Sequence, residues 1–243
     1  MSIASAKGVL FDYGGTLDTN GDHWGEVLWQ AYMQCGVPVS KEIFREAYVF
    51  GERTMGKSPL IGPADDFHRV LQVKIELQLQ YLTREIRAVE ASPAMQLEWM
   101  HTIEKLSYNR VTETINNLSR PLVEALSLRY PLLLVSNFYG NMQVVLREFG
   151  LLPYFQSIVE SSVVGLRKPS PAIFSLGVER LGLQPCEVCV VGDSFDKDIL
   201  PAHSLGCSTV WLKGHGWSDA PVDESLPTAV ITSISQLTPL LLS

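Results

Sequence analysis

Residues 8–16 read Gly-Val-Leu-Phe-Asp-Tyr-Gly-Gly-Thr, an apolar run followed by an acid and a pair of glycines. A short apolar run without alternation is typical of a strand that is buried on both faces. Two consecutive glycines favour a tight turn. The stretch therefore predicts a buried strand over residues 8–11, with Asp12 at its carboxyl end and a turn that leads to Thr16.

Further short segments of the chain share this composition. Each is rich in Val, Leu or Ile, and most are separated by amphipathic segments of helical length. This alternation predicts an α/β fold with a Rossmann-like parallel sheet that helices cover on both faces. The additional predicted strands are residues 131–137, 157–161, 187–193, 208–212 and 228–231, and the helices between them are residues 141–149, 171–181 and 198–205.

One long segment, residues 19–118, has no comparable apolar run. It carries helical periodicity instead, as in residues 67–81. We predict that residues 19–118 form an all-helical cap domain. Residues 1–18 and 119–243 would then form the α/β core domain. Pro121 is expected to open the helix that returns the chain to the core.

The composition narrows the class of protein. Hydrophobic residues make up 46% of the chain and charged residues 19%, which excludes a disordered chain. The formal net charge of -7 disfavours nucleic acid as a partner, because an acidic surface repels a phosphate backbone. No apolar run approaches the roughly 20 residues of a membrane helix, and no signal-peptide pattern opens the sequence. We therefore expect a cytoplasmic protein with no membrane partner, and no oligomeric state is predicted.

The chain has 4 cysteines, of which Cys186 and Cys189 form a C-x-x-C pair. A structural zinc site needs a second pair of ligands, and no other pair has suitable spacing. Buried, reduced thiols are therefore the expected state of these residues.

Polar residues follow four of the predicted strands. In open parallel sheets, functional groups gather at the carboxyl ends of the strands. Taken singly, each of these residues is explained by a turn, a helix cap or a solvated charge. Four such segments that reach one sheet edge in order predict a shared site. Its members are Asp12 after the first strand, Ser136 and Asn137 after the second, Lys168 after the third, and Asp193 and Asp198 after the fourth.

The charges of these residues indicate a metal. Three carboxylates, from Asp12, Asp193 and Asp198, would converge where a single lysine cannot neutralise them. A hard divalent cation with oxygen ligands can do so, and Mg²⁺ suits a site that also receives a phosphoryl group. Ser136 and Lys168 would hold phosphoryl oxygens, and the amides of the glycine turn, around Gly15 and Thr16, could add donors. Asn137 is a further candidate for substrate binding.

With these motifs in order, the sequence resembles the haloacid dehalogenase-like (HAD) hydrolase superfamily. The resemblance lies in four motifs: Asp12-Tyr-Gly-Gly-Thr16, Ser136, Lys168-Pro169, and Gly192-Asp193 followed by Asp198. It implies a helical cap inserted after the first motif. It also implies that Asp12 is a nucleophile that forms an aspartyl-phosphate, and that the Gly14 carbonyl binds Mg²⁺ together with Asp12, Asp193 and Asp198.

One position departs from the phosphatases of this superfamily. They usually carry a second Asp two residues after the nucleophile as a general acid, and this chain has Gly14 there. Three functions therefore stay open. The first is a Mg²⁺-dependent, phosphatase-like hydrolase of a small phosphorylated metabolite, with a substitute acid from Asp18, Asp22 or His23. The second is a haloacid dehalogenase, and the third is a binding protein with little turnover.

Substrate choice is expected to fall to the cap. Arg45, Arg53 and Lys57 lie near two glycines and are predicted to occupy a loop between cap helices, from which they could reach an anionic substrate.

Overall fold

The computed structural model describes residues 3–216 and 221–242. Six strands form one sheet in the order β3-β2-β1-β4-β5-β6, and every neighbouring pair is parallel. The predicted Rossmann-like parallel sheet is thus confirmed. The strands are β1 (Gly8–Phe11), β2 (Leu132–Ser136), β3 (Ser157–Glu160), β4 (Val188–Gly192), β5 (Ser208–Leu212) and β6 (Ala229–Ile231).

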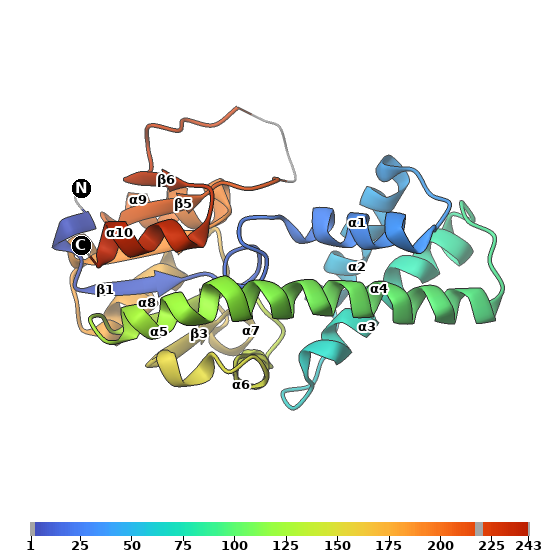
Figure 1. The fold of residues 1–243 in the computed structure, drawn as a ribbon, viewed down its shortest axis with the longest axis horizontal. Coiled ribbons are helices and arrows are strands. Elements are labelled where there is room, and N and C mark those ends of the chain that lie inside the picture. The colour runs from blue at the N-terminus through green and yellow to red at the C-terminus, as the bar shows by residue number, and fades with distance from the viewer. Residues whose placement is uncertain (1–2, 217–220, 243) are drawn as a thin grey trace.

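The helices fall into two groups (Figure 1). The helical cap lies between β1 and β2 and contains α1 (Trp24–Cys35), α2 (Lys41–Lys57), α3 (Phe67–Gln80) and α4 (Pro93–Thr114). The sheet is accompanied by α5 (Arg120–Ser127), α6 (Met142–Glu148), α7 (Ser161–Val164), α8 (Pro171–Leu181), α9 (Leu200–Ser204) and α10 (Leu237–Leu241). Single π-helical turns occur at Tyr81–Glu85, Ile115–Ser119 and Phe195–Ile199, and 3₁₀ turns at Ile3–Ser5, Leu152–Tyr154, Pro185–Glu187 and Ile234–Gln236.

Alternate side chains of the strands enter two apolar layers. Val9 and Phe11 of β1 belong to the layer that includes α5 and α10, whereas Leu10 belongs to the layer with α8 and α9. All three are fully buried, and each large apolar side chain removed from water contributes roughly 1.5–3 kcal/mol. The first layer continues into α1–α4, so the cap and this face of the sheet share one apolar cluster.

Three cap helices begin at side chains that accept hydrogen bonds from their first turns. Ser40 precedes α2, Asp66 precedes α3 and Ser92 precedes α4, and each accepts a bond from the backbone N–H three residues further on. Such caps satisfy backbone donors that have no partner inside the helix. The cap helices therefore have well-defined starting points.

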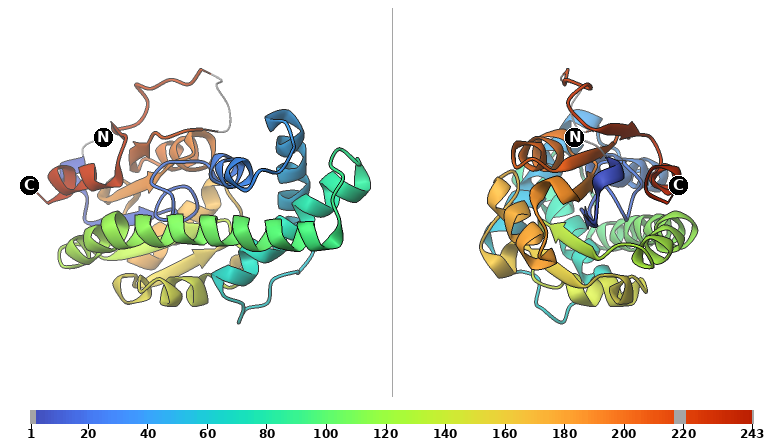
Figure 2. Two further views of the ribbon diagram at one scale, coloured as in Figure 1. Left: turned by 45° about the vertical axis from the view of Figure 1, so that its right-hand side comes forward. Right: turned by 90° about the vertical axis from the view of Figure 1, so that its left-hand side faces the viewer.

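The return from the cap to the core differs from the prediction for Pro121. Helical structure runs without interruption from α4 through the π turn Ile115–Ser119 into α5, and this long helix lies along both the cap and the sheet (Figures 1 and 2). Pro121 therefore lies inside a continuous helix rather than at a fresh start. A proline there lacks an N–H and crowds the preceding turn, and the wider π turn just before it accommodates both effects.

The prediction that the thiols are buried is correct for Cys189 and Cys207 and wrong for Cys186. Cys189 and Cys207 are buried and Cys35 is partly buried, but Cys186 is exposed. Cys186 lies in a 3₁₀ turn before β4, outside the sheet. All four thiols are free. None of the helices among the described residues combines the length and apolarity that crossing a bilayer requires.

Candidate active site

The glycine turn after β1 brings the ends of β1 and β4 into contact. Gly15 has φ +95, and a Cβ built there would lie 2.3 Å from Oδ2 of Asp193, so only glycine fits. Next to it, the Thr16 hydroxyl donates to Oδ1 of Asp193 at 3.1 Å and accepts from the Asp193 N–H at 3.0 Å. Gly15 and Thr16 thus fix the position of Asp193, in addition to any contact with a substrate.

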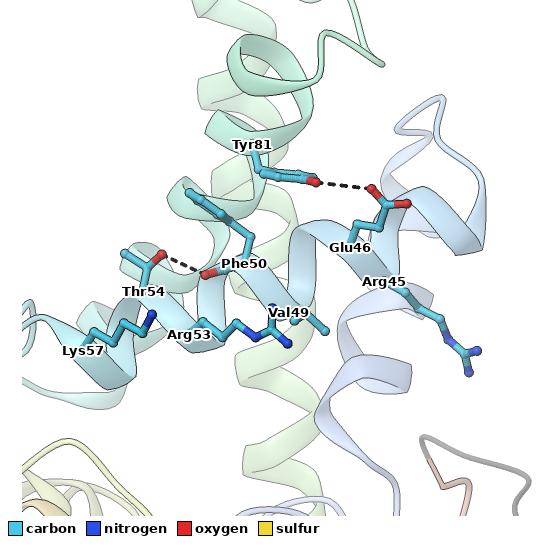
Figure 3. A pocket seen from close by; sticks show the side chains of 8 residues that line it. All are labelled: Arg45, Glu46, Val49, Phe50, Arg53, Thr54, Lys57 and Tyr81. Carbon is cyan, nitrogen blue, oxygen red and sulfur yellow. Dashed lines mark hydrogen bonds between the residues drawn. The ribbon is translucent and has the colours of Figure 1, made fainter.

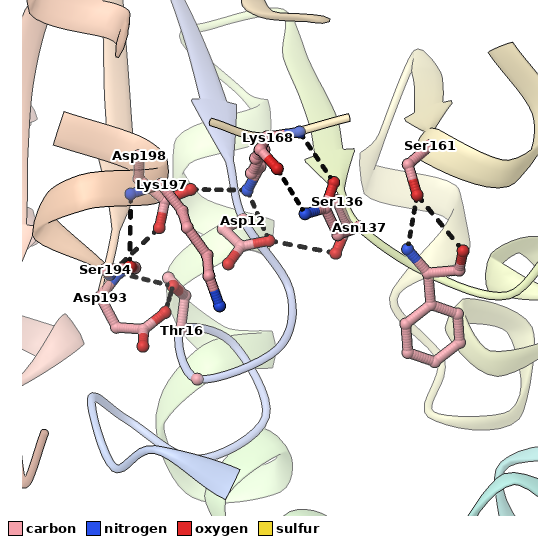
Figure 4. A network of polar contacts seen from close by, with 12 residues as sticks. Asp12, Thr16, Ser136, Asn137, Ser161, Lys168, Asp193, Ser194, Lys197 and Asp198 are labelled. Carbon is pink, nitrogen blue, oxygen red and sulfur yellow. Dashed lines mark hydrogen bonds and ion pairs between the residues drawn. The ribbon is translucent and has the colours of Figure 1, made fainter. Parts of the chain in front are cut away.

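Asp12, at the end of β1, is held by two donors (Figure 4). Its Oδ1 accepts a hydrogen bond from the Ser136 hydroxyl at 3.0 Å and lies 2.8 Å from Nζ of Lys168. Lys168 also contacts Oδ1 of Asp198 at 2.6 Å. Burial alone would lower the pKa of Lys168, but the two carboxylates raise it, so the ammonium keeps its charge. The structure therefore brings the predicted catalytic residues together.

The loop that carries Lys168 is anchored by Asn137. The Lys168 N–H donates to Oδ1 of Asn137 at 3.0 Å, and Nδ2 of Asn137 donates to the Lys168 carbonyl at 3.2 Å. This paired contact joins the end of β2 to the loop after β3. Asn137 lines the cavity described below, but both ends of its amide bind protein backbone. Its structural task is to position the lysine.

Three carboxylates meet at this edge of the sheet. One oxygen each from Asp12, Asp193 and Asp198 can be chosen so that all lie within 4.8 Å of one another. Ligands of one divalent cation, bound at about 2.0–2.6 Å, lie at separations of this size or less. Burial, and then the neighbouring carboxylates, raise the pKa of Asp193 well above its usual range. The pKa of Asp198 is raised to about 6, chiefly by burial. The cluster holds more negative charge than Lys168 offsets, so its donor set fits a divalent cation.

The three acids differ in the oxygens that they can offer. Asp198 uses Oδ1 for Lys168 and accepts from the Ser194 N–H through Oδ2 at 3.1 Å. Asp193 uses Oδ1 for Thr16, and Asp12 uses Oδ1 for Ser136 and Lys168. Among the described residues, Oδ2 of Asp12 and Oδ2 of Asp193 have no hydrogen-bond donor. These two oxygens are the natural points for a nucleophile and a metal ligand.

Asp18 and Asp22, candidates for the substitute acid, are engaged elsewhere. Asp18 is 1% exposed; it accepts from the Gly15 N–H at 2.7 Å and from Nε1 of Trp24 at 2.8 Å. Burial raises its pKa to about 7. Asp22 forms ion pairs with Arg110 and with Nδ1 of His215. Neither Asp18 nor Asp22 is among the described residues that line the cavity.

His23 is the candidate that does line the cavity. Its Nδ1 accepts a hydrogen bond from the Gly25 N–H at 3.0 Å, so the neutral ring carries its hydrogen on Nε2. Burial, followed by the charge of Lys197, lowers the pKa of His23 to about 4. At neutral pH the imidazole is therefore uncharged. It can donate a hydrogen bond, but it is a weak acid.

Gly14 leaves space where the superfamily's acid would stand. A Cβ built at Gly14 meets nothing nearer than Cδ1 and Nε1 of Trp24, both at 3.9 Å. Gly14 is also not among the glycines whose φ is positive. The missing side chain is thus not excluded by the surrounding structure.

The site opens into a cavity of about 780 Å³ that the core and the cap line together. Sequence analysis did not identify several charged residues in its wall, among them Glu52, Lys74 and Lys197. Lys197 stands between the two acids of the fourth motif, and its side chain points toward the site in Figure 4. Lys74 could have been found, because it continues the apolar face of α3 that Phe67 and Leu71 begin, at helical spacing.

The predicted cap cations lie elsewhere. Arg45, Arg53 and Lys57 belong to helix α2, not to a loop, so that prediction is wrong. Both glycines of α2 lie inside the helix: Gly51 is buried against α3, whereas Gly56 is exposed. The three cations line a separate groove on the cap with Phe50 and Tyr81 (Figure 3). This groove shares no lining residue with the cavity at Asp12.

This fold and this arrangement of residues agree with a family match. The sequence model of the haloacid dehalogenase-like hydrolase family matches residues 6–206. The chain therefore belongs to the haloacid dehalogenase-like hydrolase family.

Proteins of similar sequence include phosphatases, and solved structures of similar fold include dehalogenases. The phosphoglycolate phosphatase of Vibrio vulnificus is 29% identical over 241 residues, 98% of this chain and 96% of that one. The glyceraldehyde 3-phosphate phosphatase of Methanocaldococcus jannaschii is 39% identical over 77 residues, 32% of this chain and 34% of that one. The first curated relatives are matched over about a third of their length, 30% and 34%. A crystal structure of a dehalogenase with an intermediate complex has a fold similar to that of this chain, with a TM-score of 0.64. The two sequences are 20% identical, and the match covers 98% of each chain.

Proposed function

We propose that this chain is a Mg²⁺-dependent phosphatase that hydrolyses a small phosphorylated metabolite through an aspartyl-phosphate on Asp12. One observation carries the proposal. Asp193 lies beside Asp12 and Asp198, and among the described residues the one cation that contacts this cluster is Lys168, through Asp12 and Asp198. A metal-free reaction would have no use for a third, partly buried acid at this position, because it would repel any anionic substrate. The phosphatase relatives named above support the same class of substrate.

Asp193 would hold the metal through its outward oxygen, with Asp12 and the Gly14 carbonyl as further ligands. Asp198 would act at the site mainly through Lys168 and the Ser194 amide, which already occupy its oxygens. When bound, Mg²⁺ would supply positive charge between the nucleophile and a phosphoryl oxygen. Loss of that charge would leave two carboxylates to repel the substrate.

The residues of the chain would then act in sequence. Lys168 and the Ser136 hydroxyl hold Oδ1 of Asp12 and leave Oδ2 to attack phosphorus. The same two donors can bind phosphoryl oxygens as negative charge develops on them. The bond from phosphorus to the leaving oxygen breaks, and water later cleaves the acyl phosphate to restore Asp12. Because Gly14 supplies no acid, the leaving group departs with help from solvent or from the Nε2 hydrogen of His23.

Two other functions fit part of the site. A haloacid dehalogenase would also use Asp12 as its nucleophile and needs no acid at Gly14, but it gives Asp193 no task. A binding protein would keep the metal site without turnover.

One experiment separates the three functions. Turnover of an aryl phosphate and of a 2-haloacid is measured with Mg²⁺ and with a chelator, and metal binding is followed by calorimetry. We expect phosphate release only with Mg²⁺, and an acid-quenched enzyme that carries one phosphoryl group on Asp12. Dehalogenation that survives the chelator would replace the proposal with the second function. Metal binding without release of phosphate or halide would replace it with the third.

A further inference from the structure

The cap supplies the wall of the cavity that faces the nucleophile. Helices α1–α3 contribute mainly aromatic and aliphatic side chains, including Trp24, Tyr48 and Phe67. Among the described residues of these helices that line the cavity, only Glu52 and Lys74 carry charge. A substrate whose phosphoryl group lies at Asp12 has this wall within the same cavity as its leaving group. The sign of the charge exposed here therefore bears on which leaving groups fit.

The lysine of this pair is enclosed. Nζ of Lys74 lies 2.6 Å from Oε1 of Glu52, and only 8% of the lysine side chain is exposed. The ammonium also lies over the rings of Trp24, Tyr139 and Tyr48, at 5.5, 5.9 and 6.0 Å from their centroids. Burial alone would lower the pKa of Lys74, but Glu52, with the two tyrosines, raises it well above its usual range. The positive charge is thus fixed, and it is already used by the carboxylate.

The glutamate is the open member of the pair. Its side chain is 33% exposed. Oε1 is buried against Lys74, whereas Oε2 accepts a long hydrogen bond, 3.3 Å, from the Tyr139 hydroxyl. Burial, followed by Glu52, raises the pKa of Tyr139 to about 12, so the phenol keeps its proton and can only donate here. A ligand therefore meets an acceptor oxygen on this wall rather than a cation.

On the basis of the proposed phosphatase function, we infer that Glu52 selects phosphorylated polyols or sugars, whose leaving groups bear hydroxyl donors, over substrates with a second anionic group. A hydroxyl can donate to Oε2 of Glu52 while the ion pair with Lys74 stays intact. A second carboxylate or phosphate would face Oε2 in a partly desolvated cavity, where like charges repel strongly. The aromatic walls suit the C–H faces of a polyol or sugar.

The test uses two phosphates that differ only at the far carbon. Glucitol 6-phosphate ends in a hydroxyl, and 6-phosphogluconate ends in a carboxylate. We expect the parent enzyme to show a kcat/KM at least about tenfold higher for glucitol 6-phosphate. Glu52→Gln should bring the ratio close to one, mainly through KM, because the amide removes the repulsion. Glu46→Gln, an acid on the same helix outside this cavity, should keep the parent ratio.

Lys74→Met provides a second variant with the opposite expectation. It leaves the Glu52 charge without its partner, so the preference for glucitol 6-phosphate should rise above the parent value. A parent that favours 6-phosphogluconate, or a folded Glu52→Gln with an unchanged ratio, would overturn the inference. Turnover of an aryl phosphate is measured in parallel. If that turnover is absent with Mg²⁺, the proposed function fails, whereas a wrong ratio with aryl turnover intact overturns the inference about Glu52 alone.

Discussion

Two walls enclose the cavity, and they are built differently. The wall at the strand ends is a connected set of charges, in which Lys168 bridges Asp12 and Asp198 at 2.8 and 2.6 Å. The cap wall is largely apolar and carries one ion pair, Glu52 with Lys74. The first wall stands on buried parallel strands, and the second on helix faces. The contrast separates two tasks under the proposed function: the strand ends carry the chemistry, and the helices select the leaving group.

The largest expected effect tests the strand-end wall directly. Asp12→Asn keeps the shape of the side chain and removes the attacking charge, so turnover should fall by at least about a thousandfold. The metal-free variant should melt no lower than the parent, because the cluster loses one of its repelling carboxylates. Asp196→Asn, an exposed acid between Asp193 and Asp198, is the matched control for rate and melting temperature. Turnover near the parent level would remove Asp12 from the covalent role.

The next prediction compares the lysines of the two walls. Lys168→Met leaves buried carboxylates without a counter-ion, which should cost about 3–5 kcal/mol of unfolding free energy. Lys74→Met should cost less, about 1–2 kcal/mol, because Glu52 is partly hydrated and one orphaned group is involved. Urea unfolding of both variants without metal gives the two values. Equal losses of unfolding free energy in the two variants would mean that the two lysines contribute equally to stability.

The junction between the walls offers a pH test. Asp18 links the glycine turn to Trp24 of the cap, and burial raises its pKa from 3.8 to about 7. The folded state therefore keeps a proton that the unfolded state releases, and stability from this group is lost as pH rises from about 4 to about 7. Between pH 5 and pH 8 the parent should lose more unfolding free energy than Asp18→Asn, by at most about 3 kcal/mol. Parallel pH profiles from urea unfolding would contradict a buried, protonated Asp18.

The same contrast explains what sequence analysis could and could not predict. The strand-end residues were predictable, because a buried strand has a clear pattern and parallel strands bring their carboxyl ends to one edge. Glu52 was not identified, since it is one charged residue on an amphipathic helix, where most charges face water. Lys74 was missed although its spacing from Phe67 and Leu71 places it on the apolar face of α3. Pro121 was misplaced for a related reason: proline signals a helix start locally, and the π turn that tolerates it inside a helix has no comparable sequence signal. The assigned roles of the site residues and the domain boundaries of the cap stay predictions.

The smallest expected effect concerns Gly14, where the two walls meet. Gly14→Asp would restore the carboxyl that other phosphatases of this superfamily use. The backbone there lies outside the positive-φ region, and the new Cβ would meet Trp24 at an ordinary 3.9 Å, so the variant should fold. The new carboxyl would also compete with Asp18 for Nε1 of Trp24.

General acid catalysis can contribute roughly a hundredfold to ten-thousandfold when an acid is ideally placed. An installed acid that shares its donor with Asp18 should give less, about a tenfold rise. The rise should appear for alkyl phosphates, whose alkoxides leave poorly, and should be smaller for aryl phosphates, which leave without a proton. The ratio of alkyl to aryl rates is therefore the measurement, and Gly14→Asn, equal in size but unable to donate a proton as a carboxylic acid does, is the control. If Gly14→Asp and Gly14→Asn fold and share the parent ratio, departure of the leaving group does not limit the reaction. The natural substrate would then need no acid, or the Nε2 hydrogen of His23 on the cap side would already protonate its leaving group. The variant His23→Phe distinguishes these two cases, because it lowers the rate on alkyl phosphates only in the second.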